Sequence, residues 1–320
     1  MSGAQATHKV RVWGGLAALA FLVACDALVS VDSTQTTDAQ TAALALPAEP
    51  AVQATSERSA ALRRYLNEVQ SLQLTSGLLR QDGGGPDTPF SADMLARNFE
   101  QIVFFNEYSS NGLPRGVSGA LRRWDEAVRI GVVFGPSVPP SQRMRDRADV
   151  RAYATRLSRV TGHPISTTGT PNFLVFFVGE DDRASTLNST ATRLPGVTRT
   201  NLEAVRNLPD DAYCAVAAYA AGPNRATYTA AVAVIRAENP DLLRLSCIHE
   251  ELAQGLGLAN DSPEARPSIF NDDDEFALLT NHDEVLLAML YDARLSTGIS
   301  LTTAHPIVQN LAREATEGPL

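Results

Sequence analysis

One stretch of the chain gathers most of the polar residues that could carry chemistry: residues 247–261, which read CIHEELAQGLGLAND. Glu250 and Gln254 lie four residues apart and so share one face of a helix, with Glu251 beside them. Three apolar residues share another face, which would be buried: Ile248, Leu252 and Leu256. The stretch therefore predicts a helix with a carboxylate and amide face, ended by Gly257 at its C-terminus.

The polar positions of this helix resemble a degenerate form of the metzincin zinc motif H-E-x-x-H-x-x-G-x-x-H. In that register the three histidine positions hold Glu250, Gln254 and Asn260. Glu251 takes the place of the general base, Gly257 that of the glycine, and Asp261 follows. His249-Glu250 begins the same motif one residue earlier, but Ala253 stands where the second histidine is needed. Downstream, Ser268-Ile269-Phe270 resembles the metzincin Met-turn, with Phe270 in the place of the methionine.

These residue types do not suit zinc, which in catalytic sites takes about three protein ligands, mostly histidine. We therefore predict no metal and no other cofactor. Glu251 is the candidate catalytic residue, because a buried glutamate can have a raised pKa and act as a general base. In the structural alternative, Glu250, Gln254 and Asn260 hydrogen-bond to each other and to the turn. His249 is expected at the surface or beside a disulfide, and His282 in local capping or packing.

Longer strings resemble a bacterial family catalogued as domain of unknown function 2927. They are C-I-x-E-E-L-x-Q-x-L-G-L-x-N-D, S-I-F-N-D and F-A-L-L-T-x-H-D-E-x-L-L-x-x-L-Y-D. The resemblance runs from roughly Asp93 to Ala315. Members of that family are mostly secreted or lipid-anchored proteins of proteobacteria and have no established activity. The resemblance implies an envelope location and leaves the function open.

The N-terminus carries the features of a lipoprotein signal peptide over residues 1–25. Lys9 and Arg11 precede an apolar run from Val12 to Ala24, which is too short to span a bilayer. The run ends at Cys25, and Leu-Val-Ala-Cys resembles a bacterial lipobox, so we expect lipidation of Cys25; a plain secretory signal is the alternative. The predicted location is the cell envelope, anchored to a membrane and facing the periplasm. The net charge of −9 argues against a nucleic-acid partner.

Two cysteines remain once Cys25 is assigned to the lipid, namely Cys214 and Cys247. An even pair in an oxidising compartment is expected to form a disulfide. It would tie the start of the 247–261 helix to a strand about thirty residues earlier. Two free buried thiols are the alternative.

Apolar periodicity divides the rest of the chain. Residues 26–56 read as a flexible tether, 57–90 as an added helix and loop, and 91–320 as the main domain. The predicted helices span 57–79, 92–107 (capped by Ser91), 148–160, 198–208, 283–295 and 306–315. The predicted strands span 124–134, 172–178, 213–220 and 227–236, the last two forming a hairpin. Strand 172–178 is largely apolar, so we expect it to be central and buried on both faces. The acidic residues 180–182 are expected in a solvated loop.

This order of elements resembles that of a zincin N-terminal subdomain. It implies an α+β fold with a twisted mixed sheet, a backing helix and the 247–261 helix below the sheet. By the same resemblance, strand 227–236 is the expected edge strand, to which an extended peptide could add. We predict a lipid-anchored, non-catalytic protein that binds a peptide, a protein or an envelope component. The alternatives are an atypical hydrolase or peptidase that uses Glu251 with a non-standard or no metal, and a structural envelope component.

Overall fold

The structure is a computed structural model, and it describes residues 55–105, 118–221, 225–271 and 273–317. The chain divides into two compact units, Met1–Glu49 and Pro50–Leu320, and all described residues lie in the second. The predicted signal peptide with Cys25 and nearly all of the predicted tether lie outside the described residues. Among the described helices, none combines the length and the apolar character needed to cross a membrane.

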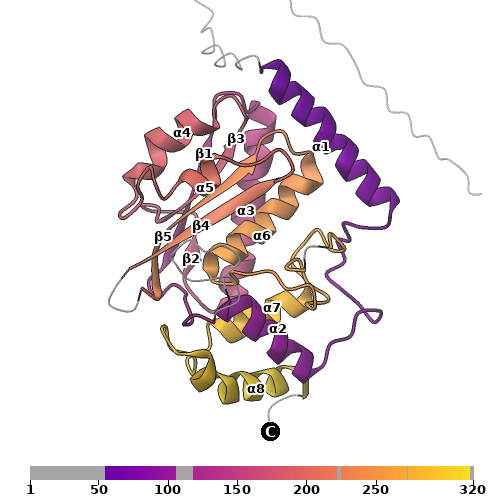
Figure 1. Cartoon of the computed structure of the whole chain (residues 1–320), viewed down its shortest axis with the longest axis vertical. Helices are drawn as coiled ribbons and strands as arrows, with labels where there is room; N and C mark the ends of the chain where they lie inside the picture. The colour runs from indigo at the N-terminus through magenta and orange to yellow at the C-terminus, as the bar shows by residue number, and fades with distance from the viewer. Residues whose placement is uncertain (1–54, 106–117, 222–224, 272, 318–320) are drawn as a thin grey trace, which may run out of the picture. The chain divides into compact units, whose positions relative to one another are not determined.

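The elements of the described part follow one another as a mixed α/β pattern (Figure 1). They are α1 (Glu57–Thr75), α2 (Ala92–Phe104), β1 (Val128–Phe134), α3 (Pro140–Thr161), β2 (Ile165–Ser166), β3 (Phe173–Val178), α4 (Arg183–Thr190), the 3-10 helix η1 (Ala191–Arg193), α5 (Glu203–Arg206), β4 (Cys214–Ala221), β5 (Thr227–Arg236), α6 (Asp241–Leu256), α7 (Asn281–Leu290) and α8 (Leu301–Glu317).

The strands form one sheet in the order β2-β1-β3-β5-β4, in which only β4 is antiparallel to its neighbour. The predicted mixed sheet and the predicted central position of strand 172–178 are therefore confirmed. The expectation that strand 227–236 is the edge is wrong, because β5 lies between β3 and β4. Nearly every side chain of β5 is buried, as a strand covered on both faces requires. The edge strand is its hairpin partner, β4.

Alternate residues of β3 face two separate apolar cores. Phe173, Val175 and Phe177 pack into the larger core, to which α2, α3, α6, α7 and α8 contribute. Leu174, Phe176 and Val178 pack into the smaller core on the other face, beneath the α4–α5 segment. All six side chains are buried, which explains why this strand is an uninterrupted apolar run. The two cores fix the sheet between α3 and α6 on one side and α4–α5 on the other (Figure 1).

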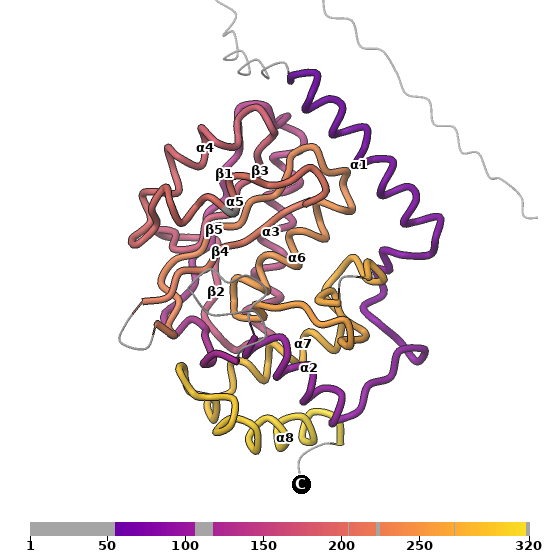
Figure 2. The backbone as a smooth tube through the Cα atoms, in the orientation of Figure 1, coloured from indigo at the N-terminus to yellow at the C-terminus, as the bar shows by residue number. Residues whose placement is uncertain are grey.

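The C-terminal helices form a separate layer with α2. Helices α2 and α8 lie side by side, and α7 packs against α3 (Figure 2). Ser91 caps α2 as predicted, since its hydroxyl accepts a hydrogen bond from the amide of Met94. Thr280 and Asp283 form a capping box at the start of α7. These caps set where the chain enters the helices that lie below the sheet.

Helix α1 confirms the predicted added helix, although it ends at Thr75 and not near Leu79. Leu62 and Leu66 bury its inner face. Polar contacts hold both of its ends: the hydroxyl of Ser59 donates to Oε1 of Glu238 at 2.6 Å, and Oε1 of Gln70 accepts from the amide of Leu243 at 3.1 Å. The second contact satisfies an amide in the first turn of α6, whose preceding Pro240 provides no side-chain cap.

Several predicted boundaries are wrong. Helix α3 begins at Pro140, not near Ala148, because two polar residues of its first turns, Gln142 and Asp146, point inward and are buried. The predicted helix 198–208 shrinks to α5, and α4 and η1 were not predicted. Helix α7 ends five residues earlier than predicted, at Leu290, and α8 begins five residues earlier, at Leu301.

Of the acidic residues 180–182, which were expected in a solvated loop, only Asp181 is exposed. Asp182 is buried, and its carboxylate accepts hydrogen bonds from the amides of Ser137 and Gly179, each at 2.8 Å. Glu180 binds the guanidinium of Arg236 at 2.9 Å, and that arginine is fully buried. A buried arginine needs such a partner, so this acidic run is a structural pairing site at the end of β3.

Candidate functional site

Helix α6 carries the polar stretch, and close packing fixes it against the sheet. Cys247 forms a disulfide with Cys214, the first residue of β4, across 33 residues of sequence. A Cβ atom at Gly255 would stand 2.4 Å from the ring of Phe173, so the helix approaches β3 more closely than any other residue would allow. The indole N–H of Trp124 donates to the carbonyl of Gly255 at 2.8 Å. The predicted disulfide is thus confirmed, and it joins α6 to the edge strand.

The acidic pair of α6 lies beside this disulfide. The Sγ atom of Cys214 and one carboxylate oxygen from each of Glu250 and Glu251 all lie within 4.8 Å of one another. Glu250 is partly exposed, whereas Glu251 is only 3% exposed. The structure therefore places the candidate general base inside the protein, next to the first residue of β4.

The other polar residues of the motif meet at the turn that follows α6. The amide of Gln254 approaches Oδ1 of Asp261 at 3.5 Å. The side-chain amide of Asn260 donates to the carbonyls of Asp261 at 2.8 Å and Gln101 at 3.1 Å, which ties the turn to α2. The structure thus brings Gln254 to Asp261 and directs Asn260 toward backbone carbonyls.

This donor set does not fit the zinc of the metzincins. The positions in question offer carboxylates and amides, and the Asn260 amide nitrogen already donates to two carbonyls. The sulfur of Cys214 lies in a disulfide and is not the thiolate that zinc binds. Nδ1 of His249 already accepts a hydrogen bond from the backbone amide of Leu279. No metal-dependent step is therefore assigned to these residues.

The two positions predicted as structural have clear packing roles. Gly257 adopts φ +130°, and a Cβ there would stand 2.6 Å from the carbonyl oxygen of Arg122. Phe270 is fully buried in the larger core. The turn before it is held by Asp283, which accepts from the hydroxyl of Ser268 at 2.6 Å and from the amide of Ile269 at 3.1 Å. Both features position the chain beneath α6.

His249 is buried, so the first of its two predicted positions, at the surface, is wrong. Its ring stacks on Tyr153 of α3 with centroids 4.0 Å apart, and Nδ1 accepts a hydrogen bond from the amide of Leu279 at 3.0 Å. Burial, with the nearby charge of Arg156 adding to it, lowers the pKa of His249 to about 3. His282 is buried as packing predicts, and its Nε2 lies 3.1 Å from the side-chain amide of Asn98.

A comparison with family models decides which family this is. The model described as "protein of unknown function (DUF2927)" matches residues 92–310. The chain belongs to this family. No curated protein and no solved structure matches the chain. The DUF2927 match begins at α2 and ends within α8, so α1 lies outside it.

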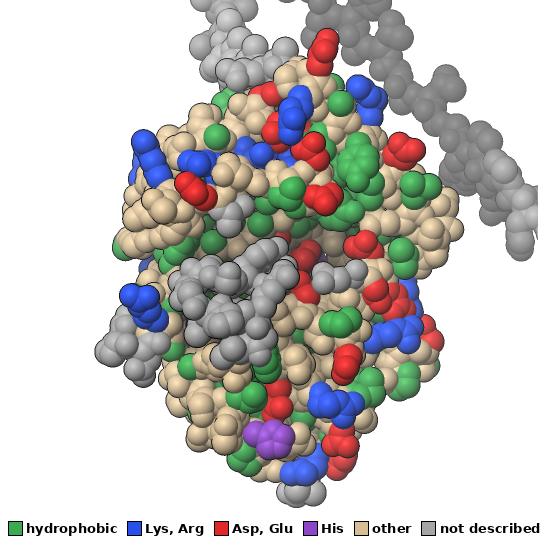
Figure 3. All heavy atoms as spheres, viewed as in Figure 1, with side chains coloured by type: hydrophobic (Ala, Val, Ile, Leu, Met, Phe, Trp, Pro, Cys, Tyr) green, Lys and Arg blue, Asp and Glu red, His purple; other side chains and the backbone are tan. Residues whose placement is uncertain are grey.

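The edge of the DUF2927 sheet is open along β4 among the described residues. The amide of Arg236 donates to the carbonyl of Tyr213, which fixes the phase of the β4–β5 ladder. Because the two sides of a strand alternate in an antiparallel ladder, the backbone groups of Cys214, Val216 and Ala218 point away from β5. No described strand pairs with them. On the face that includes this region, Figure 3 shows a central hollow with acidic side chains inside it.

Sequence reasoning missed Trp124 and Tyr153 as residues that fix α6. The hydroxyl of Tyr153 donates to the carbonyl of His249 at 2.8 Å. Both aromatic residues carry one hydrogen-bond donor, and a buried donor of this kind needs an acceptor. An isolated aromatic with a polar tip in an apolar pattern is the signal that could have found them.

Proposed function

We propose that this protein is a lipid-anchored component of the bacterial envelope whose DUF2927 domain binds an extended peptide, without catalysis. The anchor is the lipid expected on Cys25, and residues 26–56 form the tether. The observation that carries the proposal is the edge of β4, where three backbone units point away from the sheet. An extended peptide would add to this edge as a sixth strand and gain main-chain hydrogen bonds.

The chemistry beside β4 selects the kind of peptide. Glu250 and Glu251 lie within reach of Cys214, where β4 begins. The partly exposed carboxylate of Glu250 favours a peptide that carries lysine or arginine, since opposite charges give an interface its specificity and its register. The disulfide keeps the edge strand and the acidic pair in a constant relation.

The zincin resemblance supports the same site. A mixed sheet with the site helix below it is the arrangement that the resemblance implies, with the substrate cleft bounded by an edge strand, which in this chain is β4. In this chain the motif positions hold Glu250, Gln254 and Asn260, so the cleft would keep its peptide-binding edge without the zinc chemistry. This part of the proposal rests on analogy of fold.

The test is selection of peptides from a display library on the full chain in detergent, followed by affinity measurement with fluorescence anisotropy. We expect binders enriched in lysine and arginine. Methylation of alternate peptide amides should weaken binding at every second position, because strand addition uses one side of the peptide backbone. The variant Ala218→Pro removes an outward amide of β4, and an edge strand tolerates proline at such a position.

In the control, Ala61→Ser alters an exposed residue of α1 that takes no part in the ladder, and it should leave affinity unchanged. Binding that ignores both Ala218→Pro and the position of amide methylation would contradict strand addition. Turnover of the selected peptides, lost in Glu251→Gln, would replace the binding proposal by the hydrolase alternative.

A further inference from the structure

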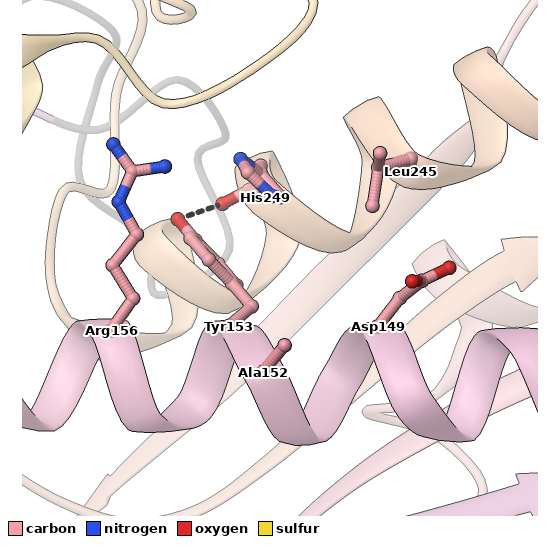
Figure 4. A pocket seen from close by; sticks show the side chains of 6 residues that line it. All are labelled: Asp149, Ala152, Tyr153, Arg156, Leu245 and His249. Atoms are coloured by element: carbon pink, nitrogen blue, oxygen red, sulfur yellow. Dashed lines mark hydrogen bonds between the residues drawn. The ribbon is translucent and has the colours of Figure 1, made fainter. Parts of the chain in front are cut away.

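A second site lies on the other side of α6, between that helix and α3. A pocket of about 170 Å³ opens there, lined by six residues, and Figure 4 shows them: Asp149, Ala152, Tyr153 and Arg156 from α3, with Leu245 and His249 from α6. None of them belongs to the β4 edge or to the acidic pair. Given that liquid water takes roughly 30 Å³ per molecule, the pocket holds roughly six groups of that size.

One wall of the pocket carries a fixed hydrogen-bond donor, the ring of His249. His249 as a whole residue is 7% exposed, and its ring lies flat on Tyr153 with an interplanar angle of 6°. Because Nδ1 accepts from the amide of Leu279, the proton of the neutral ring is on Nε2. Burial keeps the pKa of His249 near 3, so the ring stays neutral at physiological pH. Nε2–H has no hydrogen-bond partner among the residues that the structure describes.

The two ends of the pocket carry opposite charges. Asp149 lies one helical turn before Tyr153, and its carboxylate has no hydrogen bond or ion pair within the described part of the chain. Burial raises the pKa of Asp149, while the charges of Arg244 and Arg145 act in the opposite direction, so the carboxylate is partly removed from water. Arg156 lies at the other end. Its Nε and Nη2 bind Glu284 and the carbonyl of Leu279, at 2.7 and 3.0 Å, which fixes the guanidinium in place.

A ligand for this pocket must match a carboxylate at one end and donors at the other. Leu245 and Ala152 supply an apolar wall between them. A second hollow shares Asp149 and Leu245 and continues the groove toward the start of α6, which leaves room for a side chain. A single positive or negative ligand would satisfy only one end, whereas a small zwitterion satisfies both.

We propose that the pocket between α3 and α6 binds a free amino acid with a small aliphatic side chain, its ammonium group on Asp149 and its carboxylate toward Nε2–H of His249 and the guanidinium of Arg156. The side chain lies against Leu245. Because a small amino acid has few atoms that contribute binding free energy, we expect a dissociation constant on the order of 0.1–1 mM.

The test is calorimetric titration of the full chain in detergent with L-valine, L-alanine, isopropylamine and isobutyrate. Valine and alanine should bind saturably. Isopropylamine and isobutyrate, which each keep one charge, should bind at least about tenfold more weakly. Asp149→Asn should weaken valine binding at least about tenfold, because the charge-assisted hydrogen bond to the ammonium is lost.

His249→Phe should also weaken valine binding, because it removes Nε2–H while keeping a ring to stack on Tyr153. If His249→Phe unfolds the protein, Asp149→Asn still decides the test, because Asp149 is only half-buried. Met144→Ala, on an exposed part of α3 outside the pocket, is the matched control and should bind valine like the unmodified chain. Absence of saturable valine binding at about 20 mM by folded protein would overturn the proposal. Equal affinity for isopropylamine, or full affinity in Asp149→Asn, would do the same.

Discussion

Replacing Gly257 by alanine tests whether this glycine sets the turn beneath α6. The residue adopts φ +130°, a conformation that costs an L-residue about 1–3 kcal/mol. Its new Cβ would also stand 2.6 Å from the carbonyl oxygen of Arg122 and 3.0 Å from a methyl group of Leu290. The first contact is with backbone, which cannot rotate away, and overpacking of this kind costs about 1–3 kcal/mol. We therefore expect Gly257→Ala to lower the free energy of unfolding by about 2–6 kcal/mol.

Gly162→Ala is the control that separates backbone strain from collision. Gly162 ends α3 at φ +65°, and a Cβ there would meet nothing within 4 Å. Only the left-handed penalty of about 1–2 kcal/mol applies there, reduced by the lower entropy of the unfolded alanine chain. Urea unfolding followed by circular dichroism measures the free energy of unfolding of both variants. The two values are compared where the dependence of this free energy on urea concentration is the same for both. A cost for Gly257→Ala no larger than that for Gly162→Ala would refute the steric account of this turn.

Three further changes test the disulfide, the docking of α1 and the buried imidazole. Joint replacement of Cys214 and Cys247 by serine should lower the free energy of unfolding by about 3–4 kcal/mol, measured in urea without reductant, since the bridge closes a loop of 33 residues. Ser59→Ala removes a hydrogen bond to fully buried Glu238, so amide exchange in α1 should accelerate by about tenfold or more while exchange in the sheet stays unchanged. His249→Asn should flatten the pH dependence of stability between about pH 6.5 and pH 3, measured as urea midpoints at several pH values.

The sign of the last effect follows from where the proton binds. The unfolded imidazole takes up a proton below about pH 6.5, whereas burial holds the folded pKa of His249 near 3. The unfolded state therefore binds more protons in this window, and stability falls as the pH falls, by at most about 1.4 kcal/mol per unit. Carboxylates contribute equally to both proteins, so the difference between the two slopes isolates His249. Identical slopes would contradict burial of a neutral ring, just as unchanged α1 exchange in Ser59→Ala would contradict docking through Glu238.

The local sequence pattern was enough to predict those elements whose burial depends on residues close in sequence. The uninterrupted apolar run of β3 predicted a central strand, and Ser91 predicted the start of α2; both are confirmed. The stretch 247–261 predicted the site helix, although α6 extends back to Asp241. Periodicity works in these cases because burial of one face is decided within a few turns or residues of the element itself.

Where partners are remote, the pattern failed for physical reasons. A hairpin signal says that β4 and β5 pair, but the choice of which one joins β3 depends on a contact that the hairpin does not contain. The signal was available in β5, where both alternating sets of side chains are apolar, as they are in β3. The acidic residues Glu180 and Asp182 were expected in water because their partners, Arg236 and the amide of Ser137, lie more than forty residues away.

The buried environment of His249 was also invisible to the sequence. Its contacts come from Tyr153, in another helix, and from the amide of Leu279, beyond the turn. Spacing along α6 could place it off the Glu250 face but could not supply what lies opposite. The sequence pattern predicts that such a residue is exposed, because the helix that covers it is not visible in the pattern.

Helix α6 presents different chemistry on two sides, and this separates the two proposed sites. Cys247 and the acidic pair face β4, whereas His249 and Leu245 face α3. The helix is held at its first turn by Gln70 and at its last by Trp124 and Gly257, so neither side needs the other for its position. A change at Ala218 alters a backbone group that only a peptide on β4 would use, and a change at Asp149 alters a charge that only the α3–α6 pocket presents. Loss of one binding activity with retention of the other is therefore the pattern that two independent sites on one rigid helix require.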